Sequence, residues 1–233
     1  MNKSISWAGL YGFVALVFLL TVYYGNRAVT VISQSMPVTR KYTIVLDAGH
    51  GGIDGGTSSA TGRLESAYNL EIALCLNDLL ALLGYETKLV RDSDISVYTK
   101  GETIAQKKVS DLKERVRIAN ETPGSLLVSI HQNHFSDSRY SGAQVFYAHT
   151  PGSEELAQLL QSGFVSTINP GSRRAIKKGE GIYLLDHISC IGVLIECGFL
   201  SNPEEAHKLQ TKEYRQKLCS VIASELCSFL SNT

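Results

Sequence analysis

The sequence has no surplus of charge, because 22 basic side chains balance 22 acidic ones among its 233 residues. It also lacks any run of lysines and arginines with interleaved aromatic residues. Both features are typical of nucleic-acid-binding surfaces, so their absence argues against a nucleic-acid partner. Low-complexity segments and internal repeats are missing too, and 44% hydrophobic with 19% charged residues is an ordinary globular composition. Past its N-terminus, the chain predicts one domain of about 190 residues.

Cysteine pairs at metal-binding spacing are also missing. The five cysteines are odd in number, and no two of them form a C-x-x-C pair, which argues against a structural zinc site. Their apolar surroundings predict buried free thiols, and their spacing does not define a disulfide. They are Cys75, Cys190, Cys197, Cys219 and Cys227.

One long hydrophobic run is present, at the N-terminus. From Ile5 to Tyr24 the chain carries no charged side chain, and about 20 apolar residues are what a helix needs to cross a bilayer. Trp7 and Tyr23 lie near its two ends, where amphipathic aromatic rings favour the membrane interface. We therefore predict an uncleaved anchor. A cleaved signal peptide is the main alternative, although no A-x-A site precedes Gln34, and a buried core helix is a further one.

This run divides the chain into three expected parts. Residues 1–25 would be the anchor or signal segment, and residues 26–41, which are mixed and partly polar, would be a linker. A folded domain would occupy residues 42–233.

Within that domain, short apolar runs alternate with helical patterns. Buried strands are predicted at Tyr42–Asp47 and Gly192–Glu196, further strands at Tyr85–Arg91 and Leu126–His131, and an edge strand at Ala143–Ala148. Helices are predicted at Asn69–Leu83 with Gly84 as its end, at Ser110–Asn120 begun by Ser110 or Asp111, at Ser153–Ile168 with Ser153 as N-cap, and at Lys212–Leu230. This alternation predicts a single-domain α/β sandwich with a mainly parallel sheet between helices.

Polar side chains follow three of the predicted strands. His50 comes just after the first strand, His131 ends the strand LLVSIH, and Glu196 ends the strand GVLIE. Ligands of open α/β sheets bind outside the carboxyl ends of the strands, so these residues are expected to converge. Glu65, in the loop before the first helix, is a fourth candidate, and Glu71 in the same helix competes with it.

Two histidines, a carboxylate and an open position for water make a catalytic zinc site, and a further carboxylate can serve as base. Each residue also has a plainer interpretation. His50 could be an ordinary turn histidine, but glycines at 49, 51, 52 and 55 would let a metal approach closely. An ionised Glu196 at the end of a buried strand is costly without a partner or a function.

Four motifs carry a family resemblance: DAGHGGIDGG, the glutamate of GRLES, SIHQNH and IECGFLSN. In this order they resemble the zinc-dependent N-acetylmuramoyl-L-alanine amidases of the Amidase_3 type, from about Tyr42 to Leu230. The resemblance implies a six-stranded α/β sandwich around one Zn²⁺, with His50, Glu65 and His131 as metal ligands and Glu196 as the catalytic acid and base. The implied reaction is hydrolysis of the amide bond between N-acetylmuramic acid and L-alanine in peptidoglycan.

Within the family, the stretch IAQKKVSDLKERVRIAN resembles the spore-cortex amidases of endospore formers. This implies cortex maturation and germination, with peptide removal that allows a partner deacetylase to make muramic-δ-lactam. The implied location is extracytoplasmic, membrane-anchored or secreted, in the space between forespore and mother-cell membranes. Peptidoglycan would be the substrate, and an accessory protein could be needed for activity.

Two other classes of function remain as alternatives: a zinc peptidase or deacetylase acting on the cell wall, and a non-catalytic wall-binding module. Further polar residues receive structural interpretations. His134 is predicted to be a non-ligand, and Asp47 either orients an imidazole or caps a loop. Arg115 and Arg117 are predicted to make ion pairs. The remaining histidines are expected at the surface: His149, His187 and His207.

Overall fold

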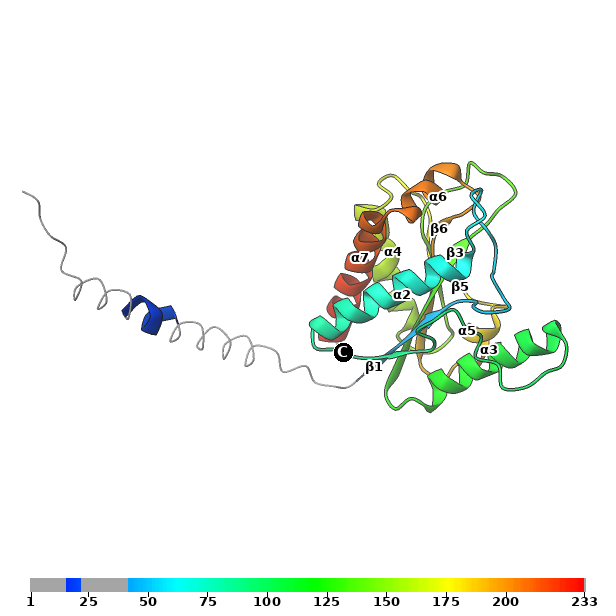
Figure 1. Cartoon of the computed structure of the whole chain (residues 1–233), viewed down its shortest axis with the longest axis horizontal. Helices are drawn as coiled ribbons and strands as arrows, with labels where there is room; N and C mark the ends of the chain where they lie inside the picture. The colour runs from blue at the N-terminus through cyan, green and yellow to red at the C-terminus, as the bar shows by residue number, and fades with distance from the viewer. Residues whose placement is uncertain (1–15, 22–41, 233) are drawn as a thin grey trace, which may run out of the picture. The chain divides into compact units, whose positions relative to one another are not determined.

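The computed structural model describes residues 16–21 and 42–232 of the chain (Figure 1). Residues 16–21 are helical, and among the described residues no helix is long and apolar enough to cross a bilayer. The rest of the expected anchor at 1–25 lies outside the described residues, and so does the whole of the expected linker at 26–41. Both therefore stay predictions.

The folded domain is built on one six-stranded sheet with the strand order β2-β1-β3-β6-β4-β5. Every neighbouring pair is parallel except β4 and β6, which run antiparallel. The expected sheet of about six mainly parallel strands is therefore confirmed as a mixed sheet with one reversal. The strands are β1 (Thr43–Ala48), β2 (Glu86–Leu89), β3 (Ser125–Asn133), β4 (Gln144–Tyr147), β5 (Lys177–Lys178) and β6 (Ile191–Phe199).

Helices cover both faces of the sheet, which confirms the predicted sandwich. Figure 1 shows α2, α4 and α7 on one face and α3 and α5 on the other, in agreement with the two hydrophobic clusters of the core. The helices are α2 (Glu65–Leu82), α3 (Ile104–Glu121), α4 (Ser153–Thr167), α5 (Tyr183–His187), α6 (Pro203–Gln210) and α7 (Lys212–Ser231).

The central strands are buried on both sides, which explains why they read as continuous apolar runs. In β1, Ile44 and Leu46 face the cluster under α2, α4 and α7, whereas Val45 faces the cluster under α3 and α5. This alternation follows from the two-residue period of a strand. The first cluster is the larger, and Tyr68 of α2 and Phe164 of α4 are fully buried in it.

Helix α3 begins six residues before the predicted start at Ser110 or Asp111. Its N-cap is Thr103, which forms a capping box with Gln106. Ser110 and Asp111 lie inside the helix and accept hydrogen bonds from the preceding loop instead: Ser110 Oγ from Thr99 N at 3.1 Å, and Asp111 Oδ1 from Val97 N at 2.7 Å. Both side chains accept hydrogen bonds from backbone N–H groups, as N-cap residues do, but these N–H groups belong to the loop and not to the first turn of the helix.

Other boundaries also differ from the predictions. The N-cap of α4 is Gly152, with a φ of 89°, and the Oγ of Ser153 accepts from Gly192 N at 3.0 Å. Strand β4 is not an edge strand, because the short strand β5 pairs with its outer side. The C-cap of α2 is Leu83, one residue before the predicted Gly84, which follows it with a φ of 86°. The predictions missed three short elements, β5, α5 and α6.

The cysteines are all free, as predicted. Cys197 and Cys219 are buried, whereas Cys75, Cys190 and Cys227 are only partly buried.

A buried ion pair joins α3 to the carboxyl end of β1. Arg115 Nη1 lies 2.5 Å from Asp47 Oδ1, and both side chains are almost inaccessible to water. Burial would raise the pKa of Asp47, but the charge of Arg115 and a hydrogen bond from Ser129 hold that pKa below its usual range. Arg115 also bonds Asp111 and donates to the carbonyl of His50 at 2.7 Å. The predicted structural role of Arg115 is confirmed, and Asp47 serves this pair.

Substituting Arg115 should destabilise the fold strongly. In Arg115→Ala, Asp47 would remain buried without its countercharge, so the free energy of unfolding should fall by about 3–5 kcal/mol. The matched control is Arg117→Ala, because Arg117 lies on the same helix and pairs with Glu114 and Glu121 at the exposed surface. Urea denaturation of both variants measures the difference. Equal losses of stability would contradict the structural weight given to the buried pair.

Candidate metal site

The predicted site residues gather at the carboxyl edge of the sheet. Strands β1, β3 and β6 are parallel neighbours, so their carboxyl ends lie at the same edge. His50 follows β1 after one intervening residue, His131 lies near the end of β3, and Glu196 is the register partner of His131 on β6. The convergence inferred from the strand pattern is confirmed.

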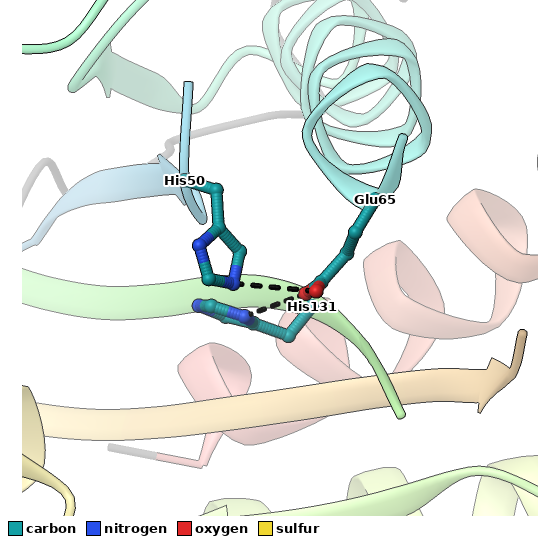
Figure 2. A group of neighbouring side chains, drawn as sticks. All are labelled: His50, Glu65 and His131. Atoms are coloured by element: carbon teal, nitrogen blue, oxygen red, sulfur yellow. Dashed lines mark hydrogen bonds and ion pairs between the residues drawn. The ribbon is translucent and has the colours of Figure 1, made fainter. Parts of the chain in front are cut away.

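Figure 2 shows the carboxylate of Glu65 beside the two histidine rings and within reach of both. Glu65 is the first residue of α2 rather than part of the preceding loop, because the helix begins four residues before its predicted start. Its Oε1 lies 2.9 Å from His131 Nδ1, and its Oε2 lies 3.3 Å from His50 Nε2. Backbone N–H groups of Gln132 and Thr57 donate to the same carboxylate, each at 3.1 Å. This largely buried carboxylate is therefore surrounded by donors.

Glu71, the competing carboxylate, does not join this cluster. It is partly exposed and pairs with Arg63 at 2.5 Å and Arg215 at 2.9 Å. Its spacing six residues after Glu65 places it on a different side of the helix. Glu65 is thus the carboxylate that the fold brings to the histidines.

His50 adopts an uncommon backbone conformation, with a φ of 60°. Its carbonyl is held by Arg115, as described above, and the next residue, Gly51, forms a bridge with Asp54. Asp54 Oδ2 lies 3.0 Å from His50 Nδ1, so the Nε2 atom is turned toward Glu65. Orientation of a ligand imidazole by a carboxylate is a common feature of metal sites.

Asp54 is a residue that the sequence interpretation missed. Asp47 was predicted either to orient an imidazole or to cap a loop, but it is bonded to Arg115 and Ser129, and no hydrogen bond joins it to a histidine in the described part of the chain. The signal for Asp54 was its spacing four residues after His50 within DAGHGGIDGG. That spacing brings the two side chains together only because glycines let the loop turn back on itself.

The cluster fits a divalent metal ion. One ligand atom from each of His50, Glu65 and His131 lies within 4.8 Å of the others, and the nitrogen, nitrogen and oxygen donors are those of catalytic zinc sites. Two glycines keep the space around them free. A Cβ on Gly49 would overlap the His131 ring, and one on Gly56 would meet both Glu65 and His50.

The charges of the cluster stabilise one another. Burial alone would lower the pKa of His50, but bonds to Glu65 and Asp54 raise it to about 9. Burial would raise the pKa of Glu65, whereas hydrogen bonds with His131 and His50 hold it far below its usual range. At neutral pH without a metal, Glu65 is therefore ionised and His50 is protonated.

Glu196 is a carboxylate beside the cluster that is held differently. Its Oε2 is buried and has no hydrogen-bond partner among the described residues. Burial raises the pKa of Glu196 to about 7. The charges of His131 and His50 lower this pKa, whereas the charge of Glu65 raises it. A carboxyl group with this pKa exchanges protons readily near neutral pH.

The other histidines lie apart from the site. His134 is exposed and is absent from the cluster, which agrees with its predicted role as a non-ligand. The remaining three are also exposed, as predicted: His149, His187 and His207.

Comparison with known proteins places this site in a family. Residues 44–228 match the family described as N-acetylmuramoyl-L-alanine amidase, Amidase_3. The chain belongs to this family. The expected enzyme class is thereby confirmed, and the matched region contains all four candidate residues.

Individual amidases resemble the chain closely. The germination-specific N-acetylmuramoyl-L-alanine amidase of Bacillus subtilis (strain 168) is 35% identical over 225 residues, covering 95% of this chain and 93% of that protein. The CwlD amidase from Clostridioides difficile, solved in complex with the GerS lipoprotein, gives a TM-score of 0.78 at 37% identity and covers 82% of this chain and 99% of that chain. The catalytic domain of CwlV from Bacillus (Paenibacillus) polymyxa gives 0.69 at 27% identity, with coverage of 82% and 99%. The resemblance to the spore-cortex branch of the family is confirmed.

Metal affinity of the amidase should depend on Gly49. In Gly49→Ala the new methyl group would displace the His131 ring, so zinc affinity should fall by about 10–100-fold, as when the support of a ligand is disturbed. Gly198→Ala is the control, because a Cβ there would meet its nearest neighbour at an ordinary 3.5 Å. Titration against a chelating dye measures both. Equal affinity in the two variants would contradict the packing argument.

Metal affinity should also rise with pH over an unusually wide range. A metal competes with the proton on His50, whose pKa of about 9 lies above the ordinary value of 6.5. Zinc affinity should thus keep increasing up to about pH 9, and binding at pH 7.5 should release a proton. Calorimetry in two buffers with different ionisation enthalpies counts that proton. In Asp54→Asn the pKa of His50 should be lower, because one group that raises it is removed. Zinc affinity should then stop increasing at a lower pH than in the native chain. Affinity that levels off below pH 7.5 in the native chain would count against this account.

Proposed function

We propose that this chain is a zinc-dependent peptidoglycan amidase that hydrolyses the bond between the lactyl group of N-acetylmuramic acid and L-alanine. In this proposal His50, Glu65 and His131 hold the metal, and Glu196 is the catalytic acid and base. The observation that carries it is the juxtaposition of a three-ligand cluster within 4.8 Å and a buried, unpartnered carboxylate oxygen on the adjacent strand. Membership of the amidase family supports the same reaction.

The number of candidate ligands suits a catalytic metal site. Catalytic zinc sites have three protein donors, whereas structural zinc sites have four. Bound to this cluster, Zn²⁺ would lower the pKa of water and polarise the amide carbonyl. Asp54 keeps the Nε2 atom of His50 aimed at the cluster, and Gly49 leaves space for the ring of His131.

Glu196 is suited to move the proton. As an ionised base it would take a proton from the attacking water, and as an acid it would deliver that proton to the alanine nitrogen when the carbon–nitrogen bond breaks. The products are a lactyl carboxylate and a free alanine amine. A pKa of about 7 suits both roles, because neither protonation state is strongly disfavoured at neutral pH.

The biological setting that we propose is spore-cortex maturation outside the cytoplasmic membrane. The similarity to a germination-specific amidase supports this setting, as does the likeness to CwlD. Removal of stem peptides would leave muramic acid ready for muramic-δ-lactam formation by a partner deacetylase. An N-terminal membrane anchor would hold the domain near this substrate. Because the CwlD structure contains the GerS lipoprotein, we also propose that an accessory protein supports activity of this chain.

Substitutions at Glu196 and His131 should separate catalysis from metal binding. Glu196→Gln should retain zinc but lose turnover by about 10²–10⁴-fold, because the proton can no longer be transferred. His131→Ala should lose both zinc and activity. Glu180→Gln is the control, because Glu180 is exposed and is not part of the cluster. The assay measures zinc content and newly exposed alanine N-termini after digestion of peptidoglycan.

Two outcomes would overturn the proposal. Full turnover by Glu196→Gln would remove Glu196 from the mechanism. Release of another group, such as acetate or an amine within the peptide, would indicate a deacetylase or peptidase instead.

A further inference from the structure

A second feature lies beside the catalytic edge, an open groove with a volume of about 1040 Å³. Its walls come from the loop after β3, the segment between α4 and β5, and α6. Figure 1 shows α6 immediately beyond the carboxyl end of β6, the strand that carries Glu196. We call this space the basic groove, for the five cationic side chains that line it: Arg139, Arg173, Arg174, Lys177 and Lys208.

The reversal of β4 brings the basic groove next to the site. Because β4 is antiparallel to β6, its first residue, Gln144, is the register partner of Glu196. Gln144 lines the groove, and its side chain bonds to Arg174 and to the carbonyl of Ala175 on the groove wall. A substrate whose scissile amide reaches Glu196 can thus extend across one strand into the groove.

The charge in the groove is unbalanced. Asp137 is the single carboxylate in its lining, and it pairs with Arg139 at 2.7 Å. Lys208 pairs with Glu204 at 2.6 Å. Among the described residues no ion pair involves the other three cations, Arg173, Arg174 and Lys177. Arg174 also experiences the charge of Glu205, a buried carboxylate that accepts from Gly142 N and Phe199 N. Cationic side chains nevertheless outnumber the single carboxylate in the lining of the groove by five to one, in a chain with zero formal net charge.

Arg174 is held in place rather than free in solvent. Its Nε donates to the Ser141 carbonyl at 2.7 Å, its Nη1 donates to Gln144 Oε1 at 3.2 Å, and its guanidinium lies over the Phe199 ring at 4.6 Å. Its Nη2 makes no hydrogen bond to the described residues. A fixed guanidinium with a free donor is well suited to binding a carboxylate, since little side-chain entropy is lost on binding.

We propose that the basic groove binds the carboxylates of the peptide attached to muramic acid, with Arg174 and Arg173 as the principal contacts. This inference rests on the proposed function, because the peptide enters the groove only if its alanine is placed at Glu196. The first carboxylate beyond the alanine is the α-carboxylate of the following glutamate. The groove would thus select acidic stem peptides and would hold the leaving part of the substrate.

Two soluble probes that differ in a single group test the proposal: N-acetylmuramoyl-L-alanyl-D-glutamate and its α-amide. Binding is measured by calorimetry on zinc-loaded protein carrying Glu196→Gln, so that turnover is not needed. The carboxylate probe should bind about 10-fold more tightly than the amide, because a charge-assisted hydrogen bond is lost with the amide. Adding Arg173→Gln or Arg174→Gln should abolish this preference and leave the affinity for the amide almost unchanged.

One further substitution, and the use of Arg173→Gln beside Arg174→Gln, guard against trivial effects. Lys178→Gln is the matched control, because Lys178 is exposed on β5 beside Lys177 but does not line the basic groove. The preference should survive in this variant. Arg173 makes no hydrogen bond to the described residues, so the result of Arg173→Gln does not depend on the packing around Arg174.

The outcomes distinguish the two proposals. Equal binding of the two probes by the protein with an intact groove would overturn the groove assignment, even if peptidoglycan digestion still releases alanine N-termini. A preference that persists in both arginine variants would overturn it as well. If the variants bind both probes normally but lose retention on intact cell wall, the groove serves a wall polymer and the proposal fails. Absence of alanine release by the native protein would instead refute the proposed function.

Discussion

The Glu65 carboxylate is the group on which the arrangement of the site depends. A carboxylate removed from water is costly unless donors surround it, and Glu65 receives the imidazoles of His50 and His131 and two backbone N–H groups. These donors come from the loop after β1, from β3 and from the segment before α2. Hydrogen bonds to one buried carboxylate therefore join three segments of the chain. The same hydrogen bonds raise the pKa of His50, so the metal-free site is already assembled but must release a proton when it takes up a cation.

The backbone behind this cluster is held by cations instead. Arg115 neutralises Asp47 at the end of β1 and donates to the His50 carbonyl, while Arg91 donates to the carbonyls of Ala48 and Gly49. Two buried guanidinium groups thus hold the backbone of the loop that carries His50. Because α3 supplies Arg115, packing of a helix on one face of the sheet positions a ligand at its edge. The stability of the fold and the geometry of the site depend on the same contacts.

A comparison of individual elements shows what sequence patterns could predict. The strands β1, β3 and β6 were recognisable because burial on both faces leaves only apolar residues, and the polar side chains at their ends were then conspicuous. The start of α3 was misplaced because Ser110 and Asp111 have the chemistry of caps, and only the folded loop shows which N–H groups they accept. Asp54 was overlooked for Asp47 for the same reason. Both aspartates lie four or fewer residues from His50, and their partners are chosen by a glycine-rich turn whose path local sequence does not define.

The sequence by itself determined the alternation of strands and helices, the family and a short set of candidate site residues. These properties depend on residue type and on short spacings, which survive in any conformation. Tertiary structure alone decided that Glu65, not Glu71, contacts the histidines. It also decided that Asp54 orients His50 and that β4 is antiparallel to β6. It also placed the cations of the basic groove together, although they are scattered from Arg139 to Lys208 in a chain with no net charge. Such features arise from strand direction and long-range packing, because these bring together groups that are distant in sequence.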